Sequence, residues 1–366
     1  MAGAKRNGEI ELLRFVFAMV VMFYHINNQL EIQPVNHVTF FSHGKIAVEF
    51  FFAVSGYLMA ASAKRKYNTP DIVHETGQFM RKKFWSIFPY HIICFAVAFV
   101  LVLRFSHFPS TRHMINTALS SLPNLFLVQN SGMYQRNILT PEWYITAMLW
   151  MMLLLYPLLL RFKEKFSQLA APLICVVLVG YLIHVQGKLG GTTRFVFNET
   201  VPKIYVRAFA EMCGGIFGYE IVQALKRLKL KLPVRLLLTG VEALCFIVPI
   251  AYACCDWSEK YEGYAFYFLL GGVILCFSEV SVFCKLFNNP VVYYLGRLSL
   301  PIYYTHRLPL ILYRIDEVSA IRPRNLVLLT VAVTLVLSVL LTPVSKLLMK
   351  PIHRKIERLH NREVTV

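Results

Sequence analysis

The stretch "ELLRFVFAMVVMFYHINNQL", residues 11–30, decides the fold of this chain. It belongs to an apolar run over residues 9–30 that is long enough to cross a bilayer, because a helical span needs about 20 residues. Arg14 and His25 interrupt this run. An α-helix turns by about 100° per residue, so these side chains share one face, about 16 Å apart along the axis. Ionisable groups inside a span are costly and mark functional sites.

Similar apolar runs recur along the 366 residues, of which 57% are hydrophobic and only 16% charged. Soluble domains carry about a quarter charged residues. The runs predict an all-α, polytopic transmembrane bundle of about ten helices. The predicted spans are residues 9–30, 44–62, 84–103, 141–160, 169–186, 204–224, 236–254, 263–280, 291–313 and 326–345. Residues 113–130 are too polar for a span, and they are predicted either to lie in the membrane interface or to re-enter the membrane.

The basic residues are distributed unevenly between the two sides of the predicted membrane. With the N-terminus inside, the segments on that side hold 23 Lys and Arg, and the opposite segments hold 10. Because Lys and Arg favour the cytoplasmic side, both termini are predicted to be cytoplasmic. The net charge of +18 is therefore attributed to topology, and nucleic acid is not predicted as a partner. Residues 1–350 are predicted to form the membrane domain, and residues 351–366 a basic cytoplasmic tail.

The cysteines predict neither disulfides nor a metal site. The eight cysteines show no metal-ligand spacing and no pairing framework. Most of them lie within apolar runs, where a cysteine behaves as a small hydrophobic residue.

Polar side chains recur at matching depths in three of the predicted spans. Counting along oppositely directed helices places Glu49 and His306 near the depth of His25, and Arg297 near the depth of Arg14. A carboxylate beside a histidine can fix the ring and stabilise the imidazolium that forms when the histidine removes a proton. The outer layer therefore predicts a general base, His25, with Glu49 as its partner.

The inner layer predicts an anion-binding site. It contains Arg14 and Arg297, backed by the basic run Arg81, Lys82 and Lys83. Arginine suits phosphate because its planar fork donates two parallel hydrogen bonds. Two layers a helical span apart suit a long ligand that is anionic at one end and reactive at the other.

Simpler interpretations exist for several of these residues. The run Arg81–Lys83 is equally typical of a topology signal, and Glu49 could face a water-filled vestibule. His306 is adjacent to Arg307 and could only mark the end of a helix, while His25 could simply hydrogen-bond a neighbouring helix.

Five segments, in order, resemble the motifs of the acyltransferase-3 family of integral membrane acyltransferases. The first is Arg14 followed by ten residues and His25. The others are "GKIAVEFFFAVSGYLM" (44–59), "RKKFWSIFPYH" (81–91), "PEWYITAMLWMMLLLYP" (141–157) and "LGRLSLPIYYTHRLPL" (295–310). Each motif is weak when taken singly, but five in order are specific.

The resemblance implies a membrane-bound O-acyltransferase. Members take an acyl group, mostly acetyl from cytoplasmic acetyl-CoA, and deliver it to a hydroxyl of a surface polysaccharide or of its lipid-linked precursor. The implied location is the bacterial cytoplasmic membrane, among membrane lipids, and a homo-oligomer is left open. The implied donor-binding residues are Arg14, Arg81, Lys82, Lys83 and Arg297. The implied catalytic residues are His25 and Glu49, and the implied acceptor-binding residues are Trp143, Tyr144 and His306. General-base catalysis and a covalent acyl-histidine both stay open.

The chain departs from the family pattern at three positions. Glu49 stands where many members carry Asp, and Ser86 stands where an arginine is common. Met148 occupies the place of a frequent Glu, while Glu142 precedes Trp143 instead. The alternative function is a secondary transporter or flippase of a glycan-related substrate, since ionisable residues in spans also form proton relays. No inverted repeat of the transporter kind is visible in the sequence.

Overall fold

The computed structural model describes the chain in several stretches. These are residues 6–33, 35, 37–128, 142–191, 195–197, 200–313, 315, 318 and 321–363, with side chains described as far as residue 348. Pro141, within the fourth predicted motif, and residues 129–130 of the predicted polar run lie outside the described residues, as do residues 364–366 of the predicted tail.

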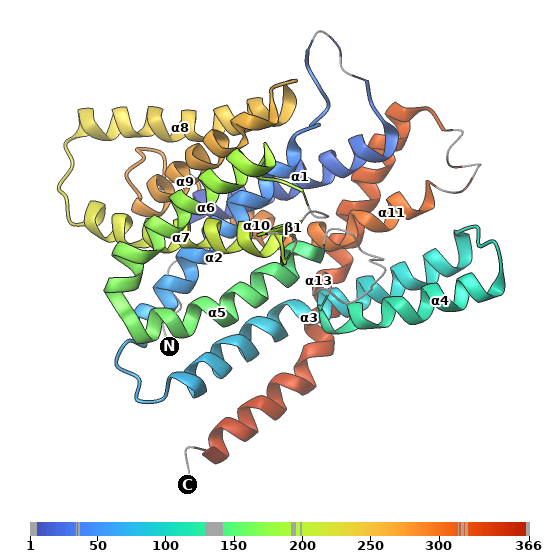
Figure 1. Ribbon diagram of the computed structural model, residues 1–366, viewed down its shortest axis with the longest axis horizontal. Helices are drawn as coiled ribbons and strands as arrows, with labels where there is room; N and C mark the ends of the chain where they lie inside the picture. The colour runs from blue at the N-terminus through green and yellow to red at the C-terminus, as the bar shows by residue number, and fades with distance from the viewer. Residues whose placement is uncertain are drawn as a thin grey trace.

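The described chain is almost entirely helical (Figure 1). The α-helices are α1 (Gly8–Leu30), α2 (Ala47–Lys64), α3 (Ile72–Phe105), α4 (Thr111–Ser121), α5 (Trp143–Lys165), α6 (Ala171–Gln186), α7 (Lys203–Lys226), α8 (Leu232–Cys254), α9 (Glu262–Ser278), α10 (Pro290–Thr305), α11 (Arg307–Leu312) and α13 (Pro323–Glu363). Short helices are η1 (Gly44–Ile46), η2 (Leu122–Phe126), η4 (Phe166–Ala170) and η5 (Glu259–Tyr261). Strands β1 (Phe195–Val196) and β2 (Val201–Pro202) form one small antiparallel pair.

The helices confirm an all-α membrane bundle. Every predicted span coincides with a helix, or with the pair α10 and α11. Six described helical segments are long and apolar enough to cross a membrane: Gly44–Lys64, Ile72–Phe105, Trp143–Gln186, Leu232–Cys254, Glu259–Ser278 and Pro323–Leu348. Helices α1, α7 and α10 fall outside this set, and they carry the ionisable residues Arg14, Arg207 and Arg297 within their length.

Two boundaries differ from the prediction. Helix α3 begins at Ile72, before the predicted residue 84, because Asp71 caps its N-terminus by accepting a hydrogen bond from the backbone N–H of His74. The predicted loop 161–168 is helical apart from a sharp break at Lys163, where φ is 51° and ψ is −129°. Helices α5 and α6 are therefore joined by η4 rather than by a loop.

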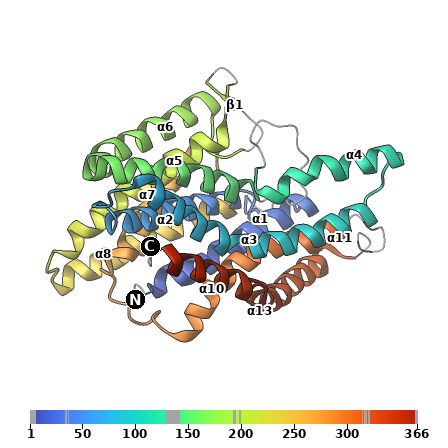
Figure 2. The same ribbon diagram turned by 90° about the horizontal axis from the view of Figure 1, so that it is seen from below.

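The polar run 113–130 contains α4 and η2. Helix α4 is too short to span a bilayer, and it folds back along the C-terminal end of α3 (Figures 1 and 2). Most of its side chains are exposed. Figure 2 shows α6 and α13 on opposite sides of the bundle. The C-terminal part of α13 continues as a helix through the predicted tail and projects away from the other helices (Figure 1).

Two glycines allow α2 and α7 to pack closely. A Cβ added to Gly56 would lie 2.1 Å from the carbonyl oxygen of Met212, and one added to Gly215 would lie 2.0 Å from that of Ala53. Small residues permit this close approach of backbones between membrane helices. The contact places Glu49 of α2 beside Arg207 of α7.

Helix α10 ends at Thr305 because Pro309 follows four residues later. Proline has no N–H with which to continue the helical hydrogen bonds. The break leaves His306 between α10 and α11, where its ring faces the C-terminal half of α1. Helices α1 and α10 pack along their length, and this contact places His25 and His306 together.

Candidate active site

Cationic side chains gather around a cavity of about 370 Å³ at one end of the bundle. We call this cavity the basic pocket. Its cations come from the start of the chain and from α1, α3, α10 and α13, and they are Arg6, Arg14, Lys83, Arg297 and Lys346. Since Arg6 and Lys346 line the same cavity, the start of α1 and the C-terminal part of α13 lie at the same end.

The basic pocket contains three of the five predicted donor-binding residues. Arg14, Lys83 and Arg297 line it, whereas Arg81 and Lys82 are exposed and point elsewhere from the same helix as Lys83. Glu11 accompanies the cations: its carboxylate lies 2.9 Å from Arg6 and 3.7 Å from Arg14. One acidic group against five cations leaves this pocket strongly basic.

A second cavity of about 360 Å³ contains His25, and we call it the histidine pocket. Helix α1 therefore supplies Arg14 to the basic pocket and His25 to the histidine pocket. The other ionisable residues that line the histidine pocket are His43, Lys45, Lys188, Arg207 and Glu259. The aromatic and hydroxyl side chains that line it are Tyr24, Ser42 and Trp143.

The ring of His306, between α10 and α11, lies beside the ring of His25. The two rings are stacked with centroids 5.2 Å apart and planes inclined by 27°. The Nδ1–H of His306 donates to the carbonyl oxygen of Ile302 at 3.0 Å, so neutral His306 carries its lone pair on Nε2. His306 is fully buried, and its Nε2 has no hydrogen-bond partner among the described residues.

The placement of Glu49 differs from the prediction. Its carboxylate forms an ion pair with Arg207, which also binds Glu211 at 3.0 Å, instead of contacting His25. All three side chains are at most 1% exposed. Counting residues gives the depth of a side chain but not the direction in which it points, and α2 presents Glu49 to α7. Above this cluster the indole ring of Trp143 lies 5.2 Å from the guanidinium carbon of Arg207.

The start of α5 separates the two pockets. Trp143 lines the histidine pocket, and the next residue, Tyr144, lines the basic pocket. Tyr303 of α10 also lines the basic pocket, with its ring centroid 5.6 Å from that of Tyr144 and 6.1 Å from that of His306. The two tyrosines therefore stand between the arginines and the stacked histidines.

Met148 lines the basic pocket beside Tyr144. Its sulfur accepts hydrogen bonds from the hydroxyls of Ser55 at 3.3 Å and Tyr144 at 3.5 Å. Glu142, at the start of α5, binds His91 of α3 instead, with its Oε1 2.6 Å from Nδ1 of the ring. Both residues are at most 1% exposed, so this pair fixes the start of α5 inside the bundle.

Ion pairs hold the rim of the histidine pocket. Glu259 binds Lys45 at 2.7 Å and Lys188 at 2.8 Å, which ties η1 and the segment after α6 to η5. Burial and the nearby Lys45 ammonium lower the pKa of His43. His43 is therefore neutral near pH 7, where it can both donate and accept a hydrogen bond.

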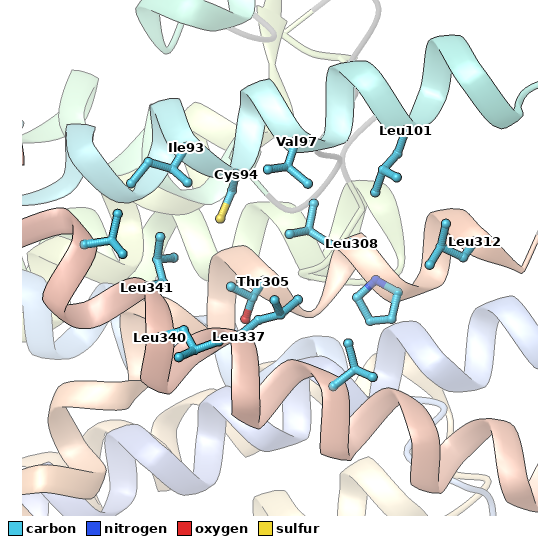
Figure 3. A pocket seen from close by; sticks show the side chains of 13 residues that line it. Ile93, Cys94, Val97, Leu101, Thr305, Leu308, Leu312, Leu337, Leu340 and Leu341 are labelled. Atoms are coloured by element: carbon cyan, nitrogen blue, oxygen red, sulfur yellow. The ribbon is translucent and has the colours of Figure 1, made fainter.

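A third cavity, of about 290 Å³, has an almost entirely apolar lining (Figure 3). Its walls come from α3, α11 and α13, including Val97, Leu308 and Leu337. Cys94 and Thr305 are its polar lining side chains, and no carboxylate, histidine or cationic side chain lines it, so we take the basic pocket and the histidine pocket as the candidate active site.

Several residues of this site were missed by the sequence analysis. Arg207 and Glu211 lie four positions apart in the least apolar predicted span, and this spacing on a helix was the signal that could have found them. Lys45, Lys188 and Glu259 lie outside the predicted layers and carry no local signal.

Comparisons with known proteins identify the family of this chain. A family model described as "Acyltransferase domain", that of the acyltransferase-3 family, matches residues 7–343. The protein "Acyltransferase MdmB" of Streptomyces mycarofaciens is 29% identical over 183 residues, which cover 46% of this chain and 45% of that protein. The chain thus spans about half the length of that relative. No solved structure gives a significant match. Because the family model covers almost the whole chain, the chain belongs to the acyltransferase-3 family of membrane acyltransferases.

Proposed function

We propose that this protein transfers an acetyl group from cytoplasmic acetyl-CoA to a hydroxyl of a glycan on the far side of the bacterial cytoplasmic membrane. The observation that supports it is the pair of pockets on the two sides of Trp143 and Tyr144. One is basic and the other contains a histidine, and α1 contributes to both. Acyl transfer itself follows from the family.

The basic pocket suits the phosphates of CoA. Arg14, Lys83 and Arg297 would bind them through charge-assisted hydrogen bonds, together with Arg6 and Lys346. The surrounding segments are those rich in Lys and Arg, so this end of the bundle is the cytoplasmic one in our proposal, with both termini on that side. Arg81 and Lys82 then act in topology rather than in binding.

His25 would act as the general base. As the acceptor oxygen attacks the thioester carbonyl, His25 takes the hydroxyl proton, the new C–O bond forms and the C–S bond breaks. The proton then passes to the CoA thiolate, which leaves as the thiol. The stacked ring of His306, with its centroid 5.2 Å from that of His25, would hold the His25 ring in place.

Glu49 would act through Arg207 rather than on His25 directly. Arg207 lines the histidine pocket under the ring of Trp143, and Glu49 fixes its guanidinium. Trp143 offers a flat face and Arg207 offers N–H donors, which suits a sugar ring and its hydroxyls. Glu49 is therefore a positioning residue, and Trp143 an acceptor-binding one.

The direct test is turnover by the purified protein. Reconstituted protein with labelled acetyl-CoA, and with no ion gradient, should release CoA and should label the glycan fraction of its native envelope. His25→Ala should abolish both, whereas His184→Ala, at an exposed position on α6, should not. Gradient-driven movement of a substrate without consumption of acetyl-CoA would instead establish the transporter alternative.

A further inference from the structure

Three ligand-type side chains converge outside both pockets. Glu9 of α1, Glu242 of α8 and Cys276 of α9 place two carboxylates and a thiol together, with one donor atom of each residue within 4.8 Å of the others. All three residues are buried. They are far apart in the sequence, which explains why the cysteine spacing predicted no metal site.

The carboxylates of this cluster have no cationic partner within the described part of the chain. Glu9 is 5% exposed, and neither of its carboxylate oxygens has a hydrogen-bond partner there. Glu242 is 8% exposed, and its Oε2 also has no hydrogen-bond partner among the described residues. Their neutral neighbours are the hydroxyl of Ser281 beside Glu9 and the thiol of Cys276 beside Glu242, each placed to donate a hydrogen bond. An ionised carboxylate is expensive to bury without a counter-charge, so these two groups must either keep a proton or bind a cation.

Arg6 and Arg235, which lie on the segments that carry Glu9 and Glu242, are engaged with other groups. Arg6 pairs with Glu11 at 2.9 Å, on the side of α1 that faces the basic pocket. Arg235 of α8 donates to the carbonyl oxygens of Val280 at 3.0 Å and Ser281 at 2.8 Å. Among the described residues, no Lys, Arg or His forms an ion pair with Glu9 or Glu242.

The backbones that carry the three residues are held together by hydrogen bonds. The side-chain amide of Asn7 donates to the backbone carbonyl oxygen of Cys276 at 2.8 Å, which fixes the first turn of α1 against α9. The backbone N–H of Val282 donates to the hydroxyl of Thr239 at 3.1 Å, which fixes the segment after α9 against α8. The donor atoms are therefore presented by a scaffold that exists before any ion binds.

We propose that Glu9, Glu242 and Cys276 bind a zinc ion. Zinc takes carboxylate oxygen at about 2.0–2.2 Å and thiolate sulfur at about 2.3 Å, and small side-chain rotations bring donors at the observed spacing to these distances. The thiolate favours zinc over magnesium and calcium, which prefer oxygen ligands. The ion would tie the first turn of α1 to α8 and α9, and α1 carries Arg14 and His25.

The test is metal binding by the full-length protein in detergent. Protein stripped with a chelator is titrated with zinc and, separately, with cobalt, whose absorption reports a thiolate ligand through a charge-transfer band. We expect one ion per chain, a thiolate–cobalt band, and a rise in Tm with zinc. Cys276→Ser should lose the band, and both Cys276→Ser and Glu9→Gln should lose the zinc-dependent rise in Tm.

Cys213→Ser is the matched control, because Cys213 is an equally buried thiol on α7. It should keep the cobalt band and the zinc-dependent rise in Tm. Two results would overturn the proposal. One is wild-type protein whose Tm does not respond to zinc, which would mean that Glu9 and Glu242 share a proton instead. The other is Cys276→Ser protein that binds as well as wild type, which would mean that zinc binds elsewhere on the surface. Neither result depends on acyl transfer.

Discussion

Arg207→Met should destabilise the protein far more than Glu49→Gln. The wild-type cluster contains one guanidinium between two carboxylates, and all three side chains are at most 1% exposed. Removal of Arg207 leaves Glu49 and Glu211 buried without a counter-charge. Removal of the partner in a buried ion pair costs about 3–5 kcal/mol. In a chain of this size the expected fall in Tm is on the order of 5 °C or more.

Glu49→Gln leaves a neutral pair, because Arg207 keeps Glu211 at 3.0 Å. Its Tm should stay near wild type, while turnover falls because Arg207 is no longer held under the ring of Trp143. The triple variant Glu49→Gln, Arg207→Met and Glu211→Gln removes every charge, so it should recover most of the Tm that Arg207→Met loses.

The assay is thermal unfolding of detergent-purified variants at one fixed heating rate, with acetyl-CoA turnover measured on the same samples. The fixed rate is needed because unfolding of membrane proteins is often irreversible. Equal destabilisation by Glu49→Gln and Arg207→Met would refute the reasoning, and so would a triple variant that is less stable than Arg207→Met alone.

Three further variants test the two pockets and the start of α5 that separates them. Lys83→Ala should weaken acetyl-CoA binding by about 10-fold or more, whereas Lys82→Ala should not, as calorimetry with CoA and with phosphate-free pantetheine can show. Tyr144→Ala should raise hydrolysis of acetyl-CoA in the absence of acceptor, because water from the histidine pocket would reach the thioester; unchanged hydrolysis would show that this tyrosine is not the barrier. His91→Gln should lower kcat and leave the KM for acetyl-CoA nearly unchanged, because it loosens Glu142 and the start of α5. A raised KM with an unchanged kcat would instead place this pair at the donor site.

The positions of the helices could be predicted because each apolar run must satisfy its backbone inside the membrane. Counting along the spans also predicted that polar groups share layers, and His25 and His306 do lie together. The direction in which a side chain points could not be predicted, since it depends on which helices pack. Glu49 faces α7 because Gly56 and Gly215 bring α2 and α7 together, a contact between helices distant in the sequence.

The basic pocket likewise combines features that could be predicted from the sequence with features that could not. Arg14 and Arg297, predicted to share one layer, line one cavity. Of the run Arg81–Lys83 only Lys83 lines it, because successive residues on a helix point about 100° apart. The start of α5 as a wall between two pockets was beyond prediction, since it depends on the buried pair of His91 and Glu142.

The central claim is that the acyl group crosses from the basic pocket to the histidine pocket. Sealed vesicles with the cytoplasmic face outward, prepared from cells that make this protein and its native envelope glycans, provide the most direct measurement. Labelled acetyl-CoA is added outside. The account predicts label on lumenal glycan that an added esterase removes only after the vesicles are opened, and no such label with His25→Ala. Label that the esterase removes from intact vesicles, or that persists with His25→Ala, would contradict it.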